Sequence, residues 1–204
     1  MDSEELAAIM LMLQRQGCHN INVVSPSHVV PQILSALLLA AQAGLRLPLV
    51  YNSGGYDSMQ SLKLLDGVVD IYMPDMKYAH EEIALRYSKI PNYPQVNQDI
   101  VREMHRQVGD LILDDDGLAL RGLLIRHLLL PNGMAGTQQI VIFLAQEIST
   151  ETYLNLMDQY RPTYCARQYP RINRPITRYE HQEAIDMALN AGLKRLDERR
   201  SRSW

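Results

Sequence analysis

Residues 122–130 read GLLIRHLLL, an apolar run interrupted by Arg126 and His127. Its length and composition predict a buried strand. Side chains alternate between the two faces of a strand, so Arg126 shares its face with Leu124 and Leu128. An arginine does not lose its charge, and within an apolar strand it needs a carboxylate or several other acceptors. One face of this strand is therefore expected to lie beside polar or charged groups that pair with Arg126.

Two other segments repeat this pattern. Residues 153–159 read YLNLMDQ and put Asn155 and Gln159 on the face opposite to the two leucines, and residues 20–25 read NINVVS and put both asparagines on one face. A parallel sheet with helices on both sides needs two apolar faces, whereas the lumen of a β/α barrel can hold a polar ligand. The pattern favours the barrel, and isolated hydrogen-bonded core residues remain the alternative.

Helical and extended segments alternate along the chain, which indicates β/α/β units in a parallel sheet. No glycine-rich phosphate loop follows a strand, so a dinucleotide-binding sheet is disfavoured. Asp57 and Thr177 are expected to cap helices, and Pro91 and Pro94 to break one. The expected strands are 20–25, 47–52, 68–74, 122–130 and 153–157, with a hairpin over 111–120; the expected helices are 3–16, 30–43, 57–65, two pieces between 78 and 107, 135–147 and 177–190. The predicted fold class is α/β, a partial (β/α) barrel of parallel strands with outer helices.

Bulk properties narrow the function classes. The chain has 204 residues, 47% of them apolar, and a net charge of -3, which fits one domain over 1–204 and gives no electrostatic reason to expect a nucleic-acid partner. An acidic start and short apolar runs predict no secretory signal, no membrane span and a cytoplasmic location. The arginine-rich tail from about residue 197 is expected to be disordered.

Polar residues recur where the expected strands end, which is where barrels of this kind carry their chemistry. They include Ser25 and His28 after one strand, Asn52 after the next, and Asp75 with Lys77 after the third. Asp75 and Lys77 are two residues apart and should point to one side, either as a ligand-binding pair or as a simple ion pair. The six histidines show no local metal-binding spacing.

Five stretches resemble the radical S-adenosylmethionine proteins of the pyruvate formate-lyase activating enzyme-like family. They cover nearly the whole chain and read GCHNINVVSPSHVVP at 17–31, VYNSGGY at 50–56, LLDGVVDIYMPDMK at 64–77, RGLLIRHLLLP at 121–131 and MDQYRP at 157–162. The resemblance implies a partial barrel that holds S-adenosylmethionine together with a [4Fe–4S] cluster. The implied cofactor-binding residues are Ser25, His28, Asn52, Asp75, Lys77 and Arg126.

The chain departs from this family at the iron–sulfur site. Family members carry a C-x-x-x-C-x-x-C loop after a first strand, and its three thiolates hold the cluster. Here the cysteines are Cys18 and Cys165, far apart in sequence. The sequence therefore resembles a member without its N-terminal first strand and cluster loop. We expect the 204-residue chain neither to assemble the cluster nor to cleave S-adenosylmethionine reductively.

Three functions follow as hypotheses. The first is a radical enzyme, in which reductive cleavage of S-adenosylmethionine gives a 5′-deoxyadenosyl radical that abstracts hydrogen from a glycyl-radical-type protein or from a small molecule. The second is a metal-dependent hydrolase or lyase that uses His28, Asp75, His127 and Asp158, although His127 should face away from Arg126. The third is a non-catalytic fragment or binding module.

Overall fold

The computed structural model describes residues 1–197, and the expected disordered tail lies almost wholly outside them. The helices are α1 Ser3–Arg15, α2 Val30–Gln42, α3 Met59–Leu65, α4 Glu81–Ser88, α5 Tyr93–Val108, α6 Thr137–Phe143 with a π-helical turn Leu144–Ile148, and α7 Arg178–Asn190; the strands are β1 Ile21–Val24, β2 Leu49–Ser53, β3 Ile71–Pro74, β4 Ile112–Leu113, β5 Ala119–Leu128, β6 Tyr153–Met157 and β7 Arg195–Leu196. Short 3₁₀ turns are Pro26–His28, Pro131–Gly133, Tyr164–Gln168 and Pro170–Ile172. None of the helices within residues 1–197 has the length and apolar character needed to cross a lipid bilayer.

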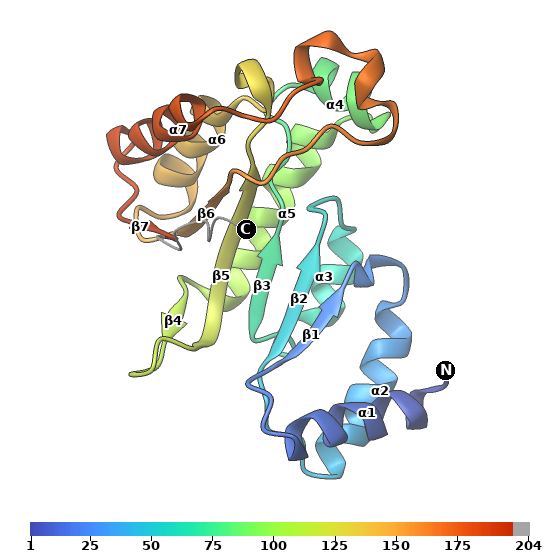
Figure 1. Ribbon diagram of the computed structural model, residues 1–204. Coiled ribbons are helices and arrows are strands. Elements are labelled where there is room, and N and C mark those ends of the chain that lie inside the picture. The colour runs from blue at the N-terminus through green and yellow to red at the C-terminus, as the bar shows by residue number, and fades with distance from the viewer. Residues whose placement is uncertain (198–204) are drawn as a thin grey trace.

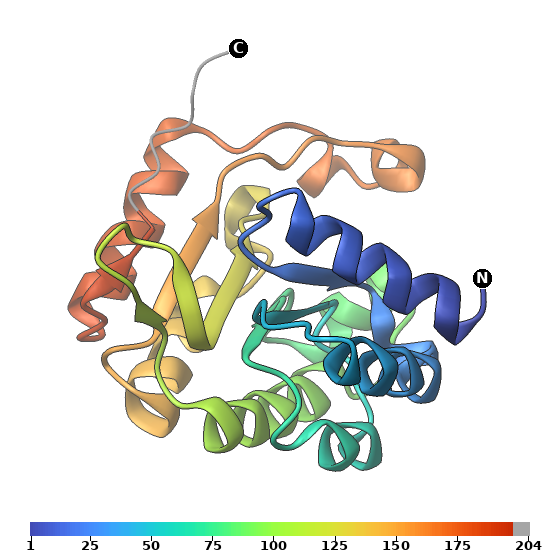
Figure 2. The same cartoon turned by 90° about the horizontal axis from the view of Figure 1, so that it is seen from below.

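The strands form one sheet in the order β1-β2-β3-β5-β6-β7, in which every neighbouring pair is parallel. β4 pairs antiparallel with β5 and gives the expected hairpin, whose second arm runs without a break into the strand that contains Arg126. The sheet is curved, and the helices lie on its outer side (Figures 1 and 2). The predicted partial (β/α) barrel is confirmed.

The two faces of the sheet differ as the alternation predicted. On the outer face, Tyr51, Tyr72, Ile125 and Leu154 are fully buried and belong to the large core cluster beneath the helices. The inner face carries a small apolar cluster of Val50, Ile71 and Leu111, against which Leu124 and Tyr153 pack.

Along the inner face of β2, β3 and β5, apolar residues are followed by polar ones toward the carboxyl end. β2 passes from Val50 to Asn52, and β5 from Leu124 to Arg126. Ile71 is followed two and four positions later by Met73 and Asp75. The hairpin side of the inner face is therefore filled by apolar packing, and the polar groups gather at the opposite end.

Two local expectations were wrong. Asp57 does not cap α3; Ser58 does, since its side chain accepts the backbone N–H of Gln60. Pro94 does not break a helix, because it lies in the first turn of α5, where a missing N–H costs nothing. The break falls between Lys89 and Asn92, which both adopt left-handed backbone conformations.

Other boundaries shifted, and one strand was missed. β3 begins at Ile71 rather than at residue 68, because Gly67 extends the preceding turn with a φ of 77°. The last strand, β7, was not anticipated, since two residues, Arg195–Leu196, carry no periodic pattern. The capping box of Thr177 and Glu180 at the start of α7 is confirmed.

Candidate ligand site on the open face of the sheet

Four of the predicted site residues form one connected group at the carboxyl ends of β2, β3 and β5. Arg126 Nε donates to Asp75 Oδ1 at 2.9 Å, and Arg126 Nη2 donates to Asn52 Oδ1 at 2.8 Å. Lys77 Nζ lies 3.4 Å from Asp75 Oδ2. We call Asn52, Asp75, Lys77 and Arg126 the open-face cluster.

The backbone brings these residues together. Asp75 and Arg126 form a parallel bridge, with the N–H of Met76 donating to the Arg126 carbonyl at 2.8 Å. The N–H of Asp75 donates to the carbonyl of Ser53 at 3.0 Å. The carboxyl-terminal parts of three adjacent strands therefore lie side by side, and these inner-face side chains meet at one point.

The charges of the open-face cluster do not cancel. One carboxylate, Asp75, faces two cations, Lys77 and Arg126, which leaves one net positive charge. The Asp75 side chain is 15% exposed, whereas that of Lys77 is 42% exposed. Arg126 Nη1 and the Asn52 amide nitrogen have no hydrogen-bond partner within residues 1–197. The cluster can therefore still donate to an anionic ligand on the open face.

The other two predicted residues lie at the neighbouring strand end. Ser25 directly follows β1 in a left-handed conformation, with a φ of 53°, and its N–H donates to the Asn52 carbonyl at 2.8 Å. Its side chain and that of His28 are exposed. In the described part of the chain, no hydrogen bond or ion pair joins the His28 ring to the open-face cluster. The structure thus connects Ser25 to the cluster through the backbone and leaves His28 beside it.

A second set of residues fixes the same strand ends from the helix side. Asp57 is buried and accepts three hydroxyl groups: Ser27 at 2.5 Å, Tyr51 at 2.8 Å and Ser53 at 2.6 Å. Ser27 comes from the loop after β1, and the others from β2. Asp57 therefore ties the loops after β1 and β2 together.

Helix α5 holds the loops after β2 and β3. Asn97 Nδ2 donates to the carbonyl of Gly55 at 2.7 Å and to that of Asp75 at 2.9 Å. The Tyr93 hydroxyl lies 3.1 Å from the carbonyl oxygens of Gly54 and Asp75 and accepts the N–H of Lys77 at 3.0 Å. Burial raises the pKa of Tyr93 well above its ordinary value, so the hydroxyl stays protonated.

His127 completes this set from β5. It is fully buried, and its Nδ1 donates to the carbonyl of Met76 at 2.6 Å. Since a carbonyl only accepts, Nδ1 carries the proton, and Nε2 accepts the Thr137 hydroxyl at 3.0 Å. Burial lowers the pKa of His127 to about 4. We call Asp57, Tyr93, Asn97 and His127 the helix-side lock.

The sequence reasoning missed most of the lock. It assigned Asp57 to helix capping and gave Tyr93 and Asn97 no role. Their spacing carried a usable signal, since residues four apart on a helix share one face. The Ser-Gly-Gly-Tyr-Asp order after β2 offered another, because a carboxylate so close to a turn can reach back to the strand.

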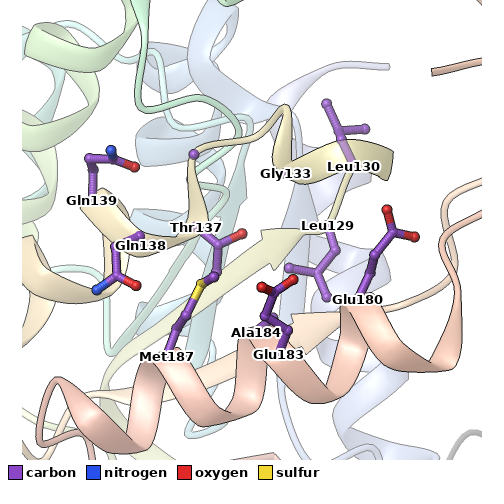
Figure 3. A pocket seen from close by; sticks show the side chains of 11 residues that line it. Leu129, Leu130, Gly133, Thr137, Gln138, Gln139, Glu180, Glu183, Ala184 and Met187 are labelled. Atoms are coloured by element: carbon purple, nitrogen blue, oxygen red, sulfur yellow. The ribbon is translucent and has the colours of Figure 1, made fainter. Parts of the chain in front are cut away.

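A separate pocket lies between α6 and α7 (Figure 3), with a volume of about 110 Å³. Cofactor pockets usually measure roughly 300–1,000 Å³, so this one is too small for a nucleoside ligand. Its Glu180 is already bound to Arg174 and to the Thr177 cap. Those partners lower the pKa of Glu180 far below its ordinary value. We therefore treat this pocket as part of the packing of α7.

The residues of the metal-dependent hypothesis do not converge. His127 has both ring nitrogens in hydrogen bonds on the helix-covered face, while Asp75 is held by cations on the open face. Within residues 1–197, no group of three His, Cys, Asp or Glu side chains is arranged to hold a metal ion. Cys18 follows α1, and Cys165 lies in the turn Tyr164–Gln168. These residues do not fit an iron–sulfur cluster.

Comparisons with known proteins agree with the fold. No family model matches the chain. It is 34% identical over 186 residues to the uncharacterized protein MJ0674 of Methanocaldococcus jannaschii, an alignment that covers 91% of this chain and 50% of the relative. The chain thus spans about half the length of this relative.

The structure of the chain resembles the crystal structure of a domain of pyruvate-formate lyase-activating enzyme from Bacteroides vulgatus. The TM-score is 0.59, with 14% identity over 87% of this chain and 98% of that domain. The chain has the fold of that activating-enzyme domain.

Proposed function

We propose that this chain is the cofactor-binding half-barrel of a radical S-adenosylmethionine protein, and that its open-face cluster binds the amino-acid part of S-adenosylmethionine. The single observation that carries the proposal is the net positive charge of the cluster, with unused donors on Arg126, Asn52 and Lys77. The fold shared with an activating-enzyme domain supports it.

The ligand chemistry matches the cluster. The methionine part of S-adenosylmethionine carries a carboxylate and an ammonium group. The free guanidinium nitrogen of Arg126 and the ammonium of Lys77 are suited to the carboxylate, and Asp75 is suited to the ammonium. Asn52 adds an amide donor beside them, and the exposed Ser25 and His28 side chains lie at the rim. The helix-side lock holds the backbone that presents these groups, which reduces the ordering cost of binding.

The radical chemistry belongs to the cofactor pair and not to these residues. In radical S-adenosylmethionine proteins a [4Fe–4S] cluster supplies the electron that cleaves the cofactor. Because residues 1–197 do not fit such a cluster, the role proposed for them is to bind and orient the cofactor. We expect the 204-residue chain to yield no 5′-deoxyadenosine after anaerobic reconstitution with iron and sulfide. A glycyl-radical-type protein and a small molecule both remain candidate substrates of the whole protein.

Equilibrium binding of S-adenosylmethionine to the 204-residue chain tests the proposal. Arg126→Gln should weaken binding by about tenfold, since it removes a charge-assisted contact. Arg121→Gln is the matched control: the same substitution lies on β5 at the other end of the strand, where Arg121 contacts the carbonyl of Gln107. Circular dichroism should show both variants folded. Equal binding by the two folded variants would contradict the proposal.

A further inference from the structure

The segment that joins β6 to α7, residues 158–176, crosses the carboxyl end of the sheet. Its regular structure consists of the two short 3₁₀ turns Tyr164–Gln168 and Pro170–Ile172. Figures 1 and 2 show it reaching toward α4 on the side of the sheet opposite to α3 and α5. It therefore borders the open face, and we call it the arginine strap.

The strap is strongly cationic in a chain whose net charge is negative. It carries four arginines, and no Asp or Glu occurs between Asp158 and Glu180. Arg174 is paired with Glu180. Arg161, Arg167 and Arg171 are exposed, and within residues 1–197 none of them forms an ion pair. Three guanidinium groups are thus left for an external partner.

The strap is held in place by specific contacts. The Tyr169 ring packs edge-on against Tyr87 of α4 with a centroid distance of 5.2 Å, and the guanidinium of Arg86 lies 5.8 Å from both ring centroids. Near its base, the Tyr160 hydroxyl donates to the carbonyl of Ile172 at 2.9 Å. These contacts hold the backbone that carries the unpaired arginines, so less conformational entropy is lost when a partner binds.

We propose that the arginine strap is a docking surface for a carboxylate-rich polypeptide segment. Guanidinium groups pair with carboxylates through two parallel hydrogen bonds, and exposed aromatic rings add contact area at protein interfaces. Tyr164, which is 95% exposed, supplies such a ring in the middle of the strap. The strap alone carries this inference, which holds whether or not the open-face cluster binds S-adenosylmethionine.

A polypeptide partner fits better than a nucleic acid. A phosphate backbone is followed by a continuous basic stripe. Here Asp158 begins the strap, and the exposed Glu81 and Glu82 precede Arg86 on the helix that anchors it. Carboxylates at the ends of flexible side chains can turn away from these acidic groups, whereas phosphates are part of the nucleic-acid backbone itself and meet them.

Fluorescence anisotropy of a labelled oligoglutamate peptide tests this surface. The strap variant replaces Arg161, Arg167 and Arg171 with Gln. The control replaces three exposed cations elsewhere with Gln, namely Arg15, Arg46 and Lys63, and so changes the net charge equally. We expect the control to bind as the unmodified chain does and the strap variant to bind at least about tenfold more weakly. Binding to the unmodified chain should weaken as salt is added.

Three results would overturn the inference. One is equal binding by the two triple variants, after circular dichroism shows both to be folded. Another is no binding of oligoglutamate to the unmodified chain. The third is tighter binding of a labelled oligouridylate than of oligoglutamate, which would assign the strap to nucleic acid. None of these measurements involves S-adenosylmethionine, so failure here is distinct from failure of the proposed function.

Discussion

Arg126 and His127 are consecutive residues of β5, yet their surroundings differ completely. His127 lies beneath the helices with both ring nitrogens in hydrogen bonds. Arg126 lies on the open face and keeps an unused guanidinium nitrogen. The same contrast separates the helix-side lock from the open-face cluster, although both lie at the same strand ends. The side chains of the lock are hydrogen-bonded within the protein, whereas those of the cluster keep free hydrogen-bond donors. Stability should therefore depend on the lock, and ligand binding on the cluster.

The largest effect is expected where the lock meets the backbone, at Gly55. It has a φ of 73°, and a Cβ there would overlap the carbonyl oxygen of Asp75 and the amide of Asn97. Gly55→Ala should lower the free energy of unfolding by about 3 kcal/mol or more. Gly117→Ala is the matched control: its φ is 78° but its Cβ meets open space, so it should cost only about 1 kcal/mol. Urea denaturation measures both, and equal costs would show that the close approach at Gly55 does not matter.

His127 predicts a pH dependence of stability. Its pKa is lowered to about 4 in the folded chain from an ordinary value of 6.5, so the unfolded chain binds more protons between these values. The free energy of unfolding should therefore be highest above about pH 6.5. It should fall by on the order of 3 kcal/mol as the pH drops toward 4.

Urea denaturation between pH 7 and pH 4 measures this slope. His127→Asn should lower stability at pH 7 and flatten the dependence in this range. His28→Asn replaces an exposed histidine and should leave the slope unchanged. A slope that survives in His127→Asn would assign the effect to another group.

Asp57 should contribute less, since an asparagine at this position keeps one carbonyl oxygen that can still accept hydrogen bonds. Asp57→Asn removes a charged acceptor from three hydroxyls and should lower the free energy of unfolding by about 2 kcal/mol. Ser27→Ala removes one of these hydrogen bonds near the surface and should cost less than about 1 kcal/mol. Chemical denaturation compares the two, and a cost for Ser27→Ala that matches Asp57→Asn would place the whole effect in the loop after β1.

Much of this arrangement could be predicted from sequence, because it depends on local patterns. The alternation within residues 122–130 placed Arg126 and His127 on opposite faces, and the strand ends placed Asn52, Asp75 and Lys77 together. The lock depends on long-range contacts instead. Asn97 reaches Gly55 across 42 positions, and no periodicity in the sequence specifies that approach. Asp57 was misassigned because its position before a helix suits a cap equally well.

The most direct test of the central claim compares two ligands. S-adenosylmethionine carries the amino-acid part, and 5′-methylthioadenosine lacks it. The unmodified chain should prefer S-adenosylmethionine, and Arg126→Gln should reduce that preference by about tenfold, or about 1.4 kcal/mol, while leaving the affinity for 5′-methylthioadenosine unchanged. Isothermal titration of both ligands into both proteins gives the four affinities. If the preference is absent from the unmodified chain, or is the same in Arg126→Gln, the open-face cluster does not recognise the amino-acid group.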